Sequence, residues 1–187
     1  LVQFYLRIDG GQLLDKNNKI GTASLLANLM NEGTKTKTPA ELEEAVDLLG
    51  SSISISADLE SISIYGNSLA RNLEQTLDLV NEILTEPRWD KEAFEIAKTR
   101  RLSNIQQVKG NPQSLAFNAL SKKLYGDAHP SSIPLGGTTE SVNSITMNDL
   151  KEYFTTNISP KVSHFHIVGD ISAVSYTHLR AHETKAN

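Results

Sequence analysis

Hydrophobic and polar residues alternate with a period of two in four parts of the chain, which is the pattern of half-buried β-strands. The first part covers residues 1–8, and the last covers residues 162–168. Between them, residues 53–57 alternate on one parity and residues 62–64 on the other. A turn at residues 58–60 between two antiparallel strands accounts for this change of phase. The pattern therefore predicts four strands, two of them joined in a hairpin.

Apolar residues recur with helical spacing in the other segments, which are bounded by residues that start or stop helices. The predicted helices lie within residues 21–33, 38–50, 72–86, 90–110, 112–126 and 146–154. Thr38 and Glu41 have the spacing of a capping box. Asn72, Asp90 and Thr146 are the expected N-caps of three further helices.

Residues 127–144 are rich in Pro, Gly, Ser and Thr, and we expect an ordered surface loop there rather than a linker. The chain thus runs strand, two helices, hairpin, helices, strand. This order predicts the α+β fold class, with a mainly antiparallel sheet covered on one face by helices.

Composition narrows the functional classes. The 187 residues are 39% hydrophobic and 21% charged, which suits one globular domain with a sizeable core. The net charge of −4, without a long run of either sign, argues against nucleic-acid binding and against a polybasic membrane contact. The absence of cysteine excludes disulfides, thiolate zinc sites and cysteine nucleophiles. No apolar run has the length that a membrane span needs.

The two ends of the sequence are unusual. The chain opens on a strand pattern without an initiator Met, so we expect residues 1–173 to form one domain that is truncated at its N-terminus. Residues 174–184 resemble a translated adapter of sequencing libraries, and we expect residues 174–187 to be an artefactual tail. His178 and His182 in this tail have the i,i+4 spacing of a metal-binding pair, which is the alternative interpretation.

Several local strings, in this order, resemble one half-subunit of the insulinase (pitrilysin, peptidase M16) family of zinc metallopeptidases. The resemblance covers about residues 1–173. The strings that carry it are Gly21-Thr22-Ala23, Asn31-Glu32-Gly33-Thr34, Leu48-Leu49-Gly50-Ser51, Glu86-Pro87-Arg88-Trp89, Gly110-Asn111-Pro112, Leu124-Tyr125-Gly126-Asp127-Ala128-His129-Pro130, Pro134-Leu135-Gly136-Gly137-Thr138 and Ile167-Val168-Gly169-Asp170. Each string alone is weak evidence for the family, whereas the order and spacing of all the strings together are specific to it.

The resemblance implies where the catalytic chemistry of the family would lie. Active members carry an inverted HxxEH motif, in which two His bind zinc and the Glu is the general base, and a later Glu is the third ligand. These positions fall on Ser24, Ala27, Asn28 and Asn104 in this chain. Catalytic zinc needs three N, S or carboxylate ligands, and the reaction needs a base within reach of a proton. One hydroxyl, one methyl group and two carboxamides do not supply them.

The resemblance therefore implies a catalytically silent half that pairs with an HxxEH-bearing half to form a peptide-binding, proteolytic chamber. We expect zinc in that partner half, no cofactor in this segment, peptide as the substrate, and no catalysis by this segment alone. An alternative is a structural or interaction protein derived from the same fold with no role in proteolysis. The chain is expected to be soluble, in a bacterial cytoplasm or periplasm.

Other polar groups have two interpretations each. His164 and His166 could form a relocated metal site, but they are more typical of a half-exposed edge strand. His129 is expected to pack within its loop. Gly136 and Gly137 could cradle a phosphate, although no GK[ST] follows them.

Cations and a hydroxyl complete the set of candidates. Lys98, Arg100 and Arg101 could steer an acidic peptide or simply form the solvated face of a long helix. Ser24 could be a nucleophile, but no His or Lys is placed in sequence to activate it, so capping or packing explains it better.

Overall fold

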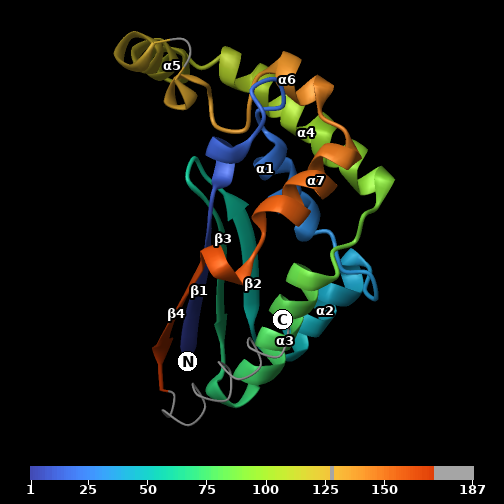
Figure 1. Cartoon of the computed structure of the whole chain (residues 1–187). Helices are drawn as coiled ribbons and strands as arrows, with labels where there is room; N and C mark the ends of the chain where they lie inside the picture. Colours follow the sequence, from blue (N-terminus) through green and yellow to red (C-terminus); the bar gives the residue numbers. More distant parts are fainter. Residues whose placement is uncertain (127–128, 171–187) are drawn as a thin grey trace.

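The computed structural model describes residues 1–126 and 129–170, and its centre is a four-stranded sheet (Figure 1). The strands are β1 (Val2–Asp9), β2 (Ser52–Ala57), β3 (Ser61–Ser68) and β4 (Ser163–Gly169). They lie in the order β2-β3-β1-β4, and every neighbouring pair is antiparallel. The N-terminal strand β1 is therefore interior, between β3 and β4, while β2 and β4 form the edges. All four predicted strands are confirmed.

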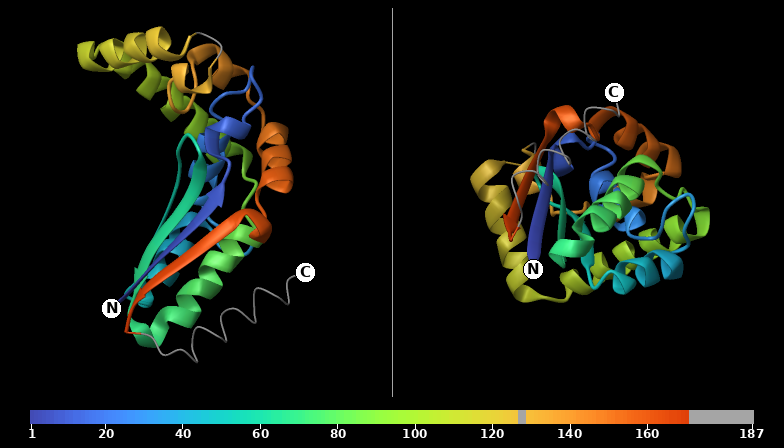
Figure 2. Two further views of the ribbon diagram at one scale, coloured as in Figure 1. Left: turned by 60° about the vertical axis from the view of Figure 1, so that its left-hand side comes forward. Right: turned by 90° about the horizontal axis from the view of Figure 1, so that it is seen from below.

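Helices occupy the sequence between the strands. The α-helices are α1 (Thr22–Met30), α2 (Pro39–Leu48), α3 (Leu73–Thr85), α4 (Lys91–Lys109), α5 (Pro112–Tyr125), α6 (Thr139–Ser144) and α7 (Met147–Asn157). Short 3-10 turns are η1 (Gly11–Leu14), η2 (Ala70–Asn72), η3 (Pro130–Ser132) and η4 (Pro160–Val162). Figures 1 and 2 show the helices gathered on one side of the sheet, except α5, which extends beyond one end of it. The predicted α+β class and its helix-covered sheet are confirmed.

The two faces of the sheet differ because side chains alternate along each strand. Val2, Phe4 and Ile8 of β1 are buried against the helices. Ile62 and Ile64 of β3 continue this apolar layer. The other face is polar, and the serines of β2 that point to it are exposed. The core thus lies between one face of the sheet and the helices that cover it.

Several predicted helix caps are present. Thr38 and Glu41 form a reciprocal capping box at the start of α2. Asp90 accepts a hydrogen bond from the backbone N–H of Ala93, and Thr146 caps α7. Asn72 is the N-cap residue of α3, as predicted, but its side chain makes no capping hydrogen bond, because its amide donates to the Leu49 carbonyl instead. Asn72 therefore ties α3 to the end of α2.

The segment predicted as a surface loop, residues 127–144, is more structured than expected. Its described part contains η3 and α6, and Ser132, Ser141 and Val142 are buried. Thr138 and Ser141 form a capping box, a signal that the sequence contained but that the Pro and Gly content obscured. Among the described residues, no helix is both long and apolar enough to cross a membrane.

Gly66 of β3 makes space for an aromatic ring of the neighbouring strand. A Cβ atom at this position would lie 2.2 Å from Phe4 Cζ and 2.6 Å from the backbone oxygen of Ser52. Gly66 lies opposite Phe4 in the register, at the centre of the sheet. The glycine is therefore required by packing rather than by its backbone angles.

We predict that Gly66→Ala lowers the free energy of unfolding by about 1–3 kcal/mol, because the added methyl group overpacks the core. Urea denaturation measures the change. Gly110→Ala is the matched control, since its Cβ would meet nothing closer than 3.4 Å. The control should change stability by no more than about 0.5 kcal/mol. Equal effects of both variants would contradict the packing role of Gly66.

Candidate functional site

The candidate site lies on α1, a helix that is buried on most of its surface. Leu25, Leu26, Leu29 and Met30 are at most 1% exposed. The helix begins after Gly21, whose φ of +110° favours glycine. This apolar helix packs against β2, α4 and α7. Only a narrow part of its surface is open to a ligand.

Three of the four predicted site positions lie together on α1. Ser24, Ala27 and Asn28 are spaced i, i+3 and i+4, so they lie on one side of the helix. Ser24 is half-buried, Ala27 is 2% exposed and Asn28 is exposed. Ser24 is the third residue of α1, and it does not cap the helix. The capping role that was one of its expected roles is therefore wrong, and packing stays the expectation.

The fourth position, Asn104, is on α4, which packs against α1. Its side chain is exposed. A hydroxyl and two carboxamides at Ser24, Asn28 and Asn104 do not match the ligands of catalytic zinc. Within residues 1–126 and 129–170, no group of three or more His, Asp or Glu side chains is placed to hold a metal ion.

The N-terminus of α1 is anchored by a buried carboxylate that sequence reasoning missed. Asp15 Oδ2 accepts a hydrogen bond from the Gly21 N–H at 2.7 Å, and Oδ1 accepts one from Ala23 N–H at 3.0 Å. These amides are among the unpaired donors at the start of a helix. Burial raises the pKa of Asp15 to about 6, although hydrogen bonds from Gly21, Ala23 and Thr22 act to lower it.

The segment that includes Gly136 and Gly137 covers the loop before α1. Gly136 N–H donates to Gln12 Oε1 at 2.7 Å, and the Gly136 carbonyl accepts from Arg101 Nε at 3.0 Å. Gly137 N–H donates to the Pro134 carbonyl at 2.9 Å. Both glycine amides are thus engaged within the protein. The arrangement gives the glycines a structural role and leaves neither amide free for a phosphate.

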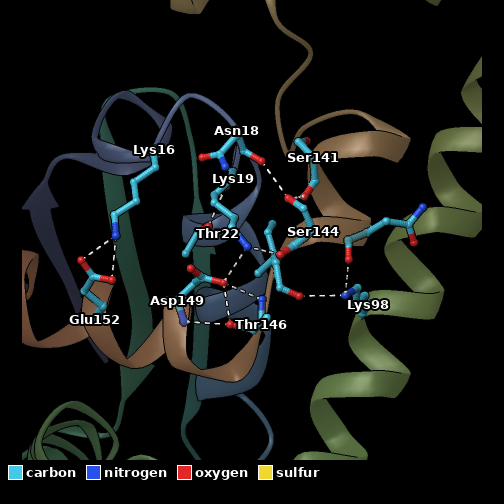
Figure 3. Close-up of polar contacts among 12 residues, drawn as sticks. Lys16, Asn18, Lys19, Thr22, Lys98, Ser141, Ser144, Thr146, Asp149 and Glu152 are labelled. Atoms are coloured by element: carbon cyan, nitrogen blue, oxygen red, sulfur yellow. Dashed lines mark hydrogen bonds and ion pairs between the residues drawn. The ribbon is translucent and has the colours of Figure 1, made fainter.

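Cations beside α1 also bind backbone carbonyls and a carboxylate of the protein itself (Figure 3). Lys98 Nζ donates to the carbonyls of Asn143 and Ile145 at 2.8 and 2.7 Å. Lys19 forms an ion pair with Asp149 at 3.1 Å, which joins the loop before α1 to α7. Lys98, Arg100 and Arg101 were the cations considered for peptide steering. Lys98 and Arg101 instead donate hydrogen bonds to backbone carbonyls of the protein. Arg100 is exposed.

The described histidines are exposed on the surface of the protein. His164 and His166 lie on the edge strand β4 and are exposed. His164 Nε2 is 3.3 Å from Asp9 Oδ2, and the ring of His166 stacks on Tyr5 with centroids 6.1 Å apart. His129 stacks on Tyr125, the last residue of α5, with ring centroids 5.2 Å apart. His178 and His182 lie outside the described residues.

An open cavity of about 660 Å³ lies elsewhere on the surface, between the end of α3 and α7. The lining includes Lys35, Arg88, Trp89, Lys151 and Phe154, and none of the four candidate positions. Lys151 Nζ lies 5.7 Å from the centre of the Trp89 ring, and Phe154 meets the same ring edge-on at 5.4 Å. Cations and acids both line the cavity, so its charge favours no particular ligand.

Comparison with known proteins decides the family. The sequence model of the insulinase family, peptidase family M16, matches residues 2–138. The chain belongs to the insulinase family. This membership and the α+β fold confirm the resemblance seen in the sequence.

Some relatives of this chain are named as peptidase subunits, and others are named as non-peptidase homologs. The chain is 27% identical over 150 residues to the non-peptidase homolog YmxG of Helicobacter pylori, covering 80% of the chain and 34% of that protein. It is also 27% identical over 154 residues to the mitochondrial-processing peptidase subunit beta of Saccharomyces cerevisiae, covering 80% of the chain and 32% of that subunit. The chain therefore spans about one third of the length of these relatives.

Solved structures show the same fold. A peptidase M16 inactive domain from Pseudomonas fluorescens superposes with a TM-score of 0.91 at 25% identity, covering 99% of this chain and 45% of that chain. Pitrilysin superposes with a TM-score of 0.77 at 19% identity, covering 94% of this chain and 19% of that chain. The second likeness supports the fold alone.

The pKa of Asp15 generates a pH-dependent prediction. Its value in the folded chain, about 6, lies above the reference value of 3.8, so ionisation of this group costs more in the folded state than in the unfolded state. The stability contributed by the neutral carboxyl should be lost as pH rises from about 4 to about 6.

We predict that the unfolding free energy of the wild type minus that of Asp15→Asn falls by up to about 3 kcal/mol over this range and is flat above it. Urea denaturation at a series of pH values measures the difference, and the Asn variant removes the titrating group. A difference that rises with pH would show that the amide hydrogen bonds outweigh burial.

Proposed function

We propose that this chain is a catalytically silent insulinase-family half that pairs with an HxxEH-bearing half to form a peptide-binding, proteolytic chamber. The observation that carries the proposal is an intact helical scaffold with non-catalytic residues at the four chemical positions. Asp15 accepts hydrogen bonds from the amides of Gly21 and Ala23 at the start of α1, and Ser141 donates to the Ile20 carbonyl just before the helix. The scaffold is thus preserved where the ligand chemistry is replaced.

The side chains at the four site positions support the proposal that zinc is bound by the HxxEH-bearing half rather than here. Zinc supplies a charge that lowers the pKa of bound water and polarises a carbonyl group. Ser24, Asn28 and Asn104 offer no imidazole and no carboxylate to hold it. Ala27 carries no group that can take a proton. The residues at these four positions therefore do not fit a catalytic zinc site, and the role left to them is to form binding surface beside one.

A structural or interaction protein without a role in proteolysis is the second candidate. The relative named a non-peptidase homolog favours it, and so does the superposition on a domain named inactive. The two candidates differ in one measurable respect. A chamber half increases cleavage of peptide by its partner, whereas a purely structural protein does not.

The assignment of the metal-ligand positions can be tested by restoring them. We predict that the combined substitutions Ser24→His, Asn28→His and Asn104→Glu produce a chain that binds one zinc ion, because three ligands meet the requirement of a catalytic site. Equilibrium dialysis followed by metal analysis measures the stoichiometry and affinity. Ala27 stays unchanged, since the general base is not a ligand and its position is buried.

The matched control keeps Asn104 and carries only the two histidine substitutions. It should bind zinc at least about tenfold more weakly, because one of three ligands is missing. Equal affinity of the two variants would show that residue 104 is not the third ligand position. Zinc bound stoichiometrically by the wild-type chain would overturn the silent-half proposal.

The pairing itself is tested by mixing. We expect the 187-residue chain to be inactive alone. We predict that it raises peptide cleavage by an HxxEH-bearing family member from the same source at least about tenfold, because a completed binding surface orients the peptide. Cleavage of a fluorogenic peptide library measures the rate. Peptidase activity of the isolated chain would overturn the proposal. Binding to the HxxEH half without a change in rate would favour the structural alternative.

A further inference from the structure

Strand β2 is an edge of the sheet, so half of its backbone groups point away from its neighbour β3. Next to the hairpin turn, the Asp58 N–H donates to the Ser61 carbonyl at 2.9 Å, so the backbone of residue 58 points toward β3. Backbone groups alternate in direction along a strand, and those of Ile53, Ile55 and Ala57 therefore point to the open edge. Outward groups on an edge strand are a template on which another strand can be added.

The side chain of Asn31 occupies this open edge at Ile55. Asn31 is the C-cap residue of α1, and its Oδ1 accepts a hydrogen bond from the Ile55 N–H at 3.3 Å. Asn31 Nδ2 donates to the Ile55 carbonyl at 3.0 Å and to the Ala27 carbonyl of α1 at 2.8 Å. One side chain thus pairs with both outward backbone groups of Ile55 and also holds to its own helix.

The Asn31 carboxamide takes the position that one residue of an added strand would have. A carboxamide has an acceptor oxygen and an NH2 donor, which are the two kinds of group that a residue of a neighbouring strand offers. In an antiparallel pair, two opposite residues exchange both N–H···O bonds, and Asn31 exchanges the same two bonds with Ile55. An incoming strand therefore cannot pair with Ile55 unless Asn31 moves away.

The edge that Asn31 occupies borders the candidate site. Ser24, Asn28 and Asn31 are spaced i, i+4 and i+7, so they lie on the same side of α1. This helix packs against β2. The backbone groups of β2 at Ile55 are therefore the ones that a polypeptide beside Asn28 would reach first, and Asn31 is already bonded to them.

Asn31 can be displaced without opening the core. Its side chain is exposed, whereas Ile55 is only 5% exposed. Moving the carboxamide breaks its three hydrogen bonds, and water can then bond to the released side chain. Asn31 thus competes with an added strand for the same backbone groups, as an autoinhibitory contact does.

The side chains of β2 define which segment the edge would otherwise accept. Ser52, Ser54 and Ser56 face the open side of the sheet, whereas Ile53 and Ile55 pack toward the helices. An added strand continues this alternation, so it needs polar residues on the first face and apolar residues on the second. An extended peptide of alternating polarity meets this requirement.

We propose that Asn31 is an autoinhibitory side chain that closes the β2 edge of this chain to extended peptides. The inference rests on the proposed function for its choice of peptide as the excluded occupant. It adds that this half does not hold peptide by backbone pairing on β2, so its contribution to a binding surface comes from side chains. The isolated chain is sufficient for the test.

Hydrogen exchange of the 187-residue chain, followed by NMR, measures the contact directly. In Asn31→Ala the Ile55 amide should exchange at least about fivefold faster, because its acceptor is lost. The amides of Ile62 and Ile64 lie in the interior strand β3 and should exchange at the wild-type rate. An equal acceleration at Ile62 and Ile64 would mean that the whole domain is destabilised, and an unchanged rate at Ile55 would overturn the contact.

Peptide affinity measures the closure. The probe is a fluorescein-labelled peptide with the sequence of residues 61–68, which begins with alternating Ser and Ile and matches the native partner of β2. Fluorescence anisotropy should show a Kd for Asn31→Ala at least about tenfold lower than for the wild type, because the competing side chain is gone. Bound peptide should also slow exchange of the Ile53, Ile55 and Ala57 amides in this variant. Asn81→Ala is the matched control, because Asn81 is an exposed asparagine on α3, and it should bind like the wild type.

A second peptide separates strand addition from other binding. The same peptide with N-methylated isoleucines keeps its side chains but loses the backbone donors that would face β2, so it should gain no affinity for Asn31→Ala. A gain that persists with this peptide would overturn closure against strand addition. Sedimentation velocity tests a second copy as the occupant, and a dimer of Asn31→Ala with protected Ile53 and Ala57 amides would overturn peptide as the excluded partner.

The outcome is distinguishable from that of the proposed pairing. Equal peptide affinity of the wild type and Asn31→Ala overturns closure by Asn31 and leaves pairing with the HxxEH half intact. Failure of the wild-type chain to affect the HxxEH half overturns the pairing and leaves the closed edge as it is measured in the isolated chain.

Discussion

Burial of α1 is the constraint around which this domain is arranged. The helix is apolar on nearly every side, so it can be stable only when the sheet, α4 and α7 enclose it together. Enclosure leaves the backbone amides at its start without water, and Asp15 supplies the acceptors that they need. The loop before α1 is in turn held by Ser141, whose hydroxyl donates to the Ile20 carbonyl at 2.7 Å. The helical core thus determines the conformation of segments more than 120 residues apart.

The polar groups near α1 support the backbone, and this explains how the scaffold persists without the chemistry. Gln12, Lys98 and Arg101 satisfy buried carbonyls and amides that α1 and its neighbours leave unpaired. A similar brace holds the turn after α1, where Glu82 accepts from Thr34 and Lys37. Burial alone would raise the pKa of Glu82, but the hydrogen bonds from Lys37, Thr34 and Thr36 lower it to about 2. Residues at the exposed edge of α1, such as Asn28, take no part in this network, so they can change without cost to the fold.

Local sequence patterns were sufficient for the strands and for the start of α2, and the order of short strings was sufficient for the family. These features depend on local patterns, such as the alternation around Ile62 or the capping box at Thr38. The role of Asp15 was not predictable, because an Asp in a polar loop gives no local sign that it will be buried beneath a helix 6–8 residues later. Gly136 was ambiguous for a related reason, since its partners Gln12 and Arg101 are distant in sequence. The outward orientation of the apolar side of α5, where Phe117 is 61% exposed, was also hidden, because periodicity shows that a helix has two sides but not which one packs inward.

The interior position of β1 has a consequence for how the chain acquires its structure during synthesis. β1 is made before the other three strands, yet one of its two partners is β4, at residues 163–169. Until the ribosome has added about 160 further residues, one edge of β1 has open backbone donors and acceptors, which is the arrangement that invites pairing with other chains. Contacts between such distant residues also slow folding, because a long loop must close before they form. The earlier hairpin of β2 and β3 covers only the other edge of β1. A nascent chain of this topology is therefore most exposed to aggregation before β4 emerges.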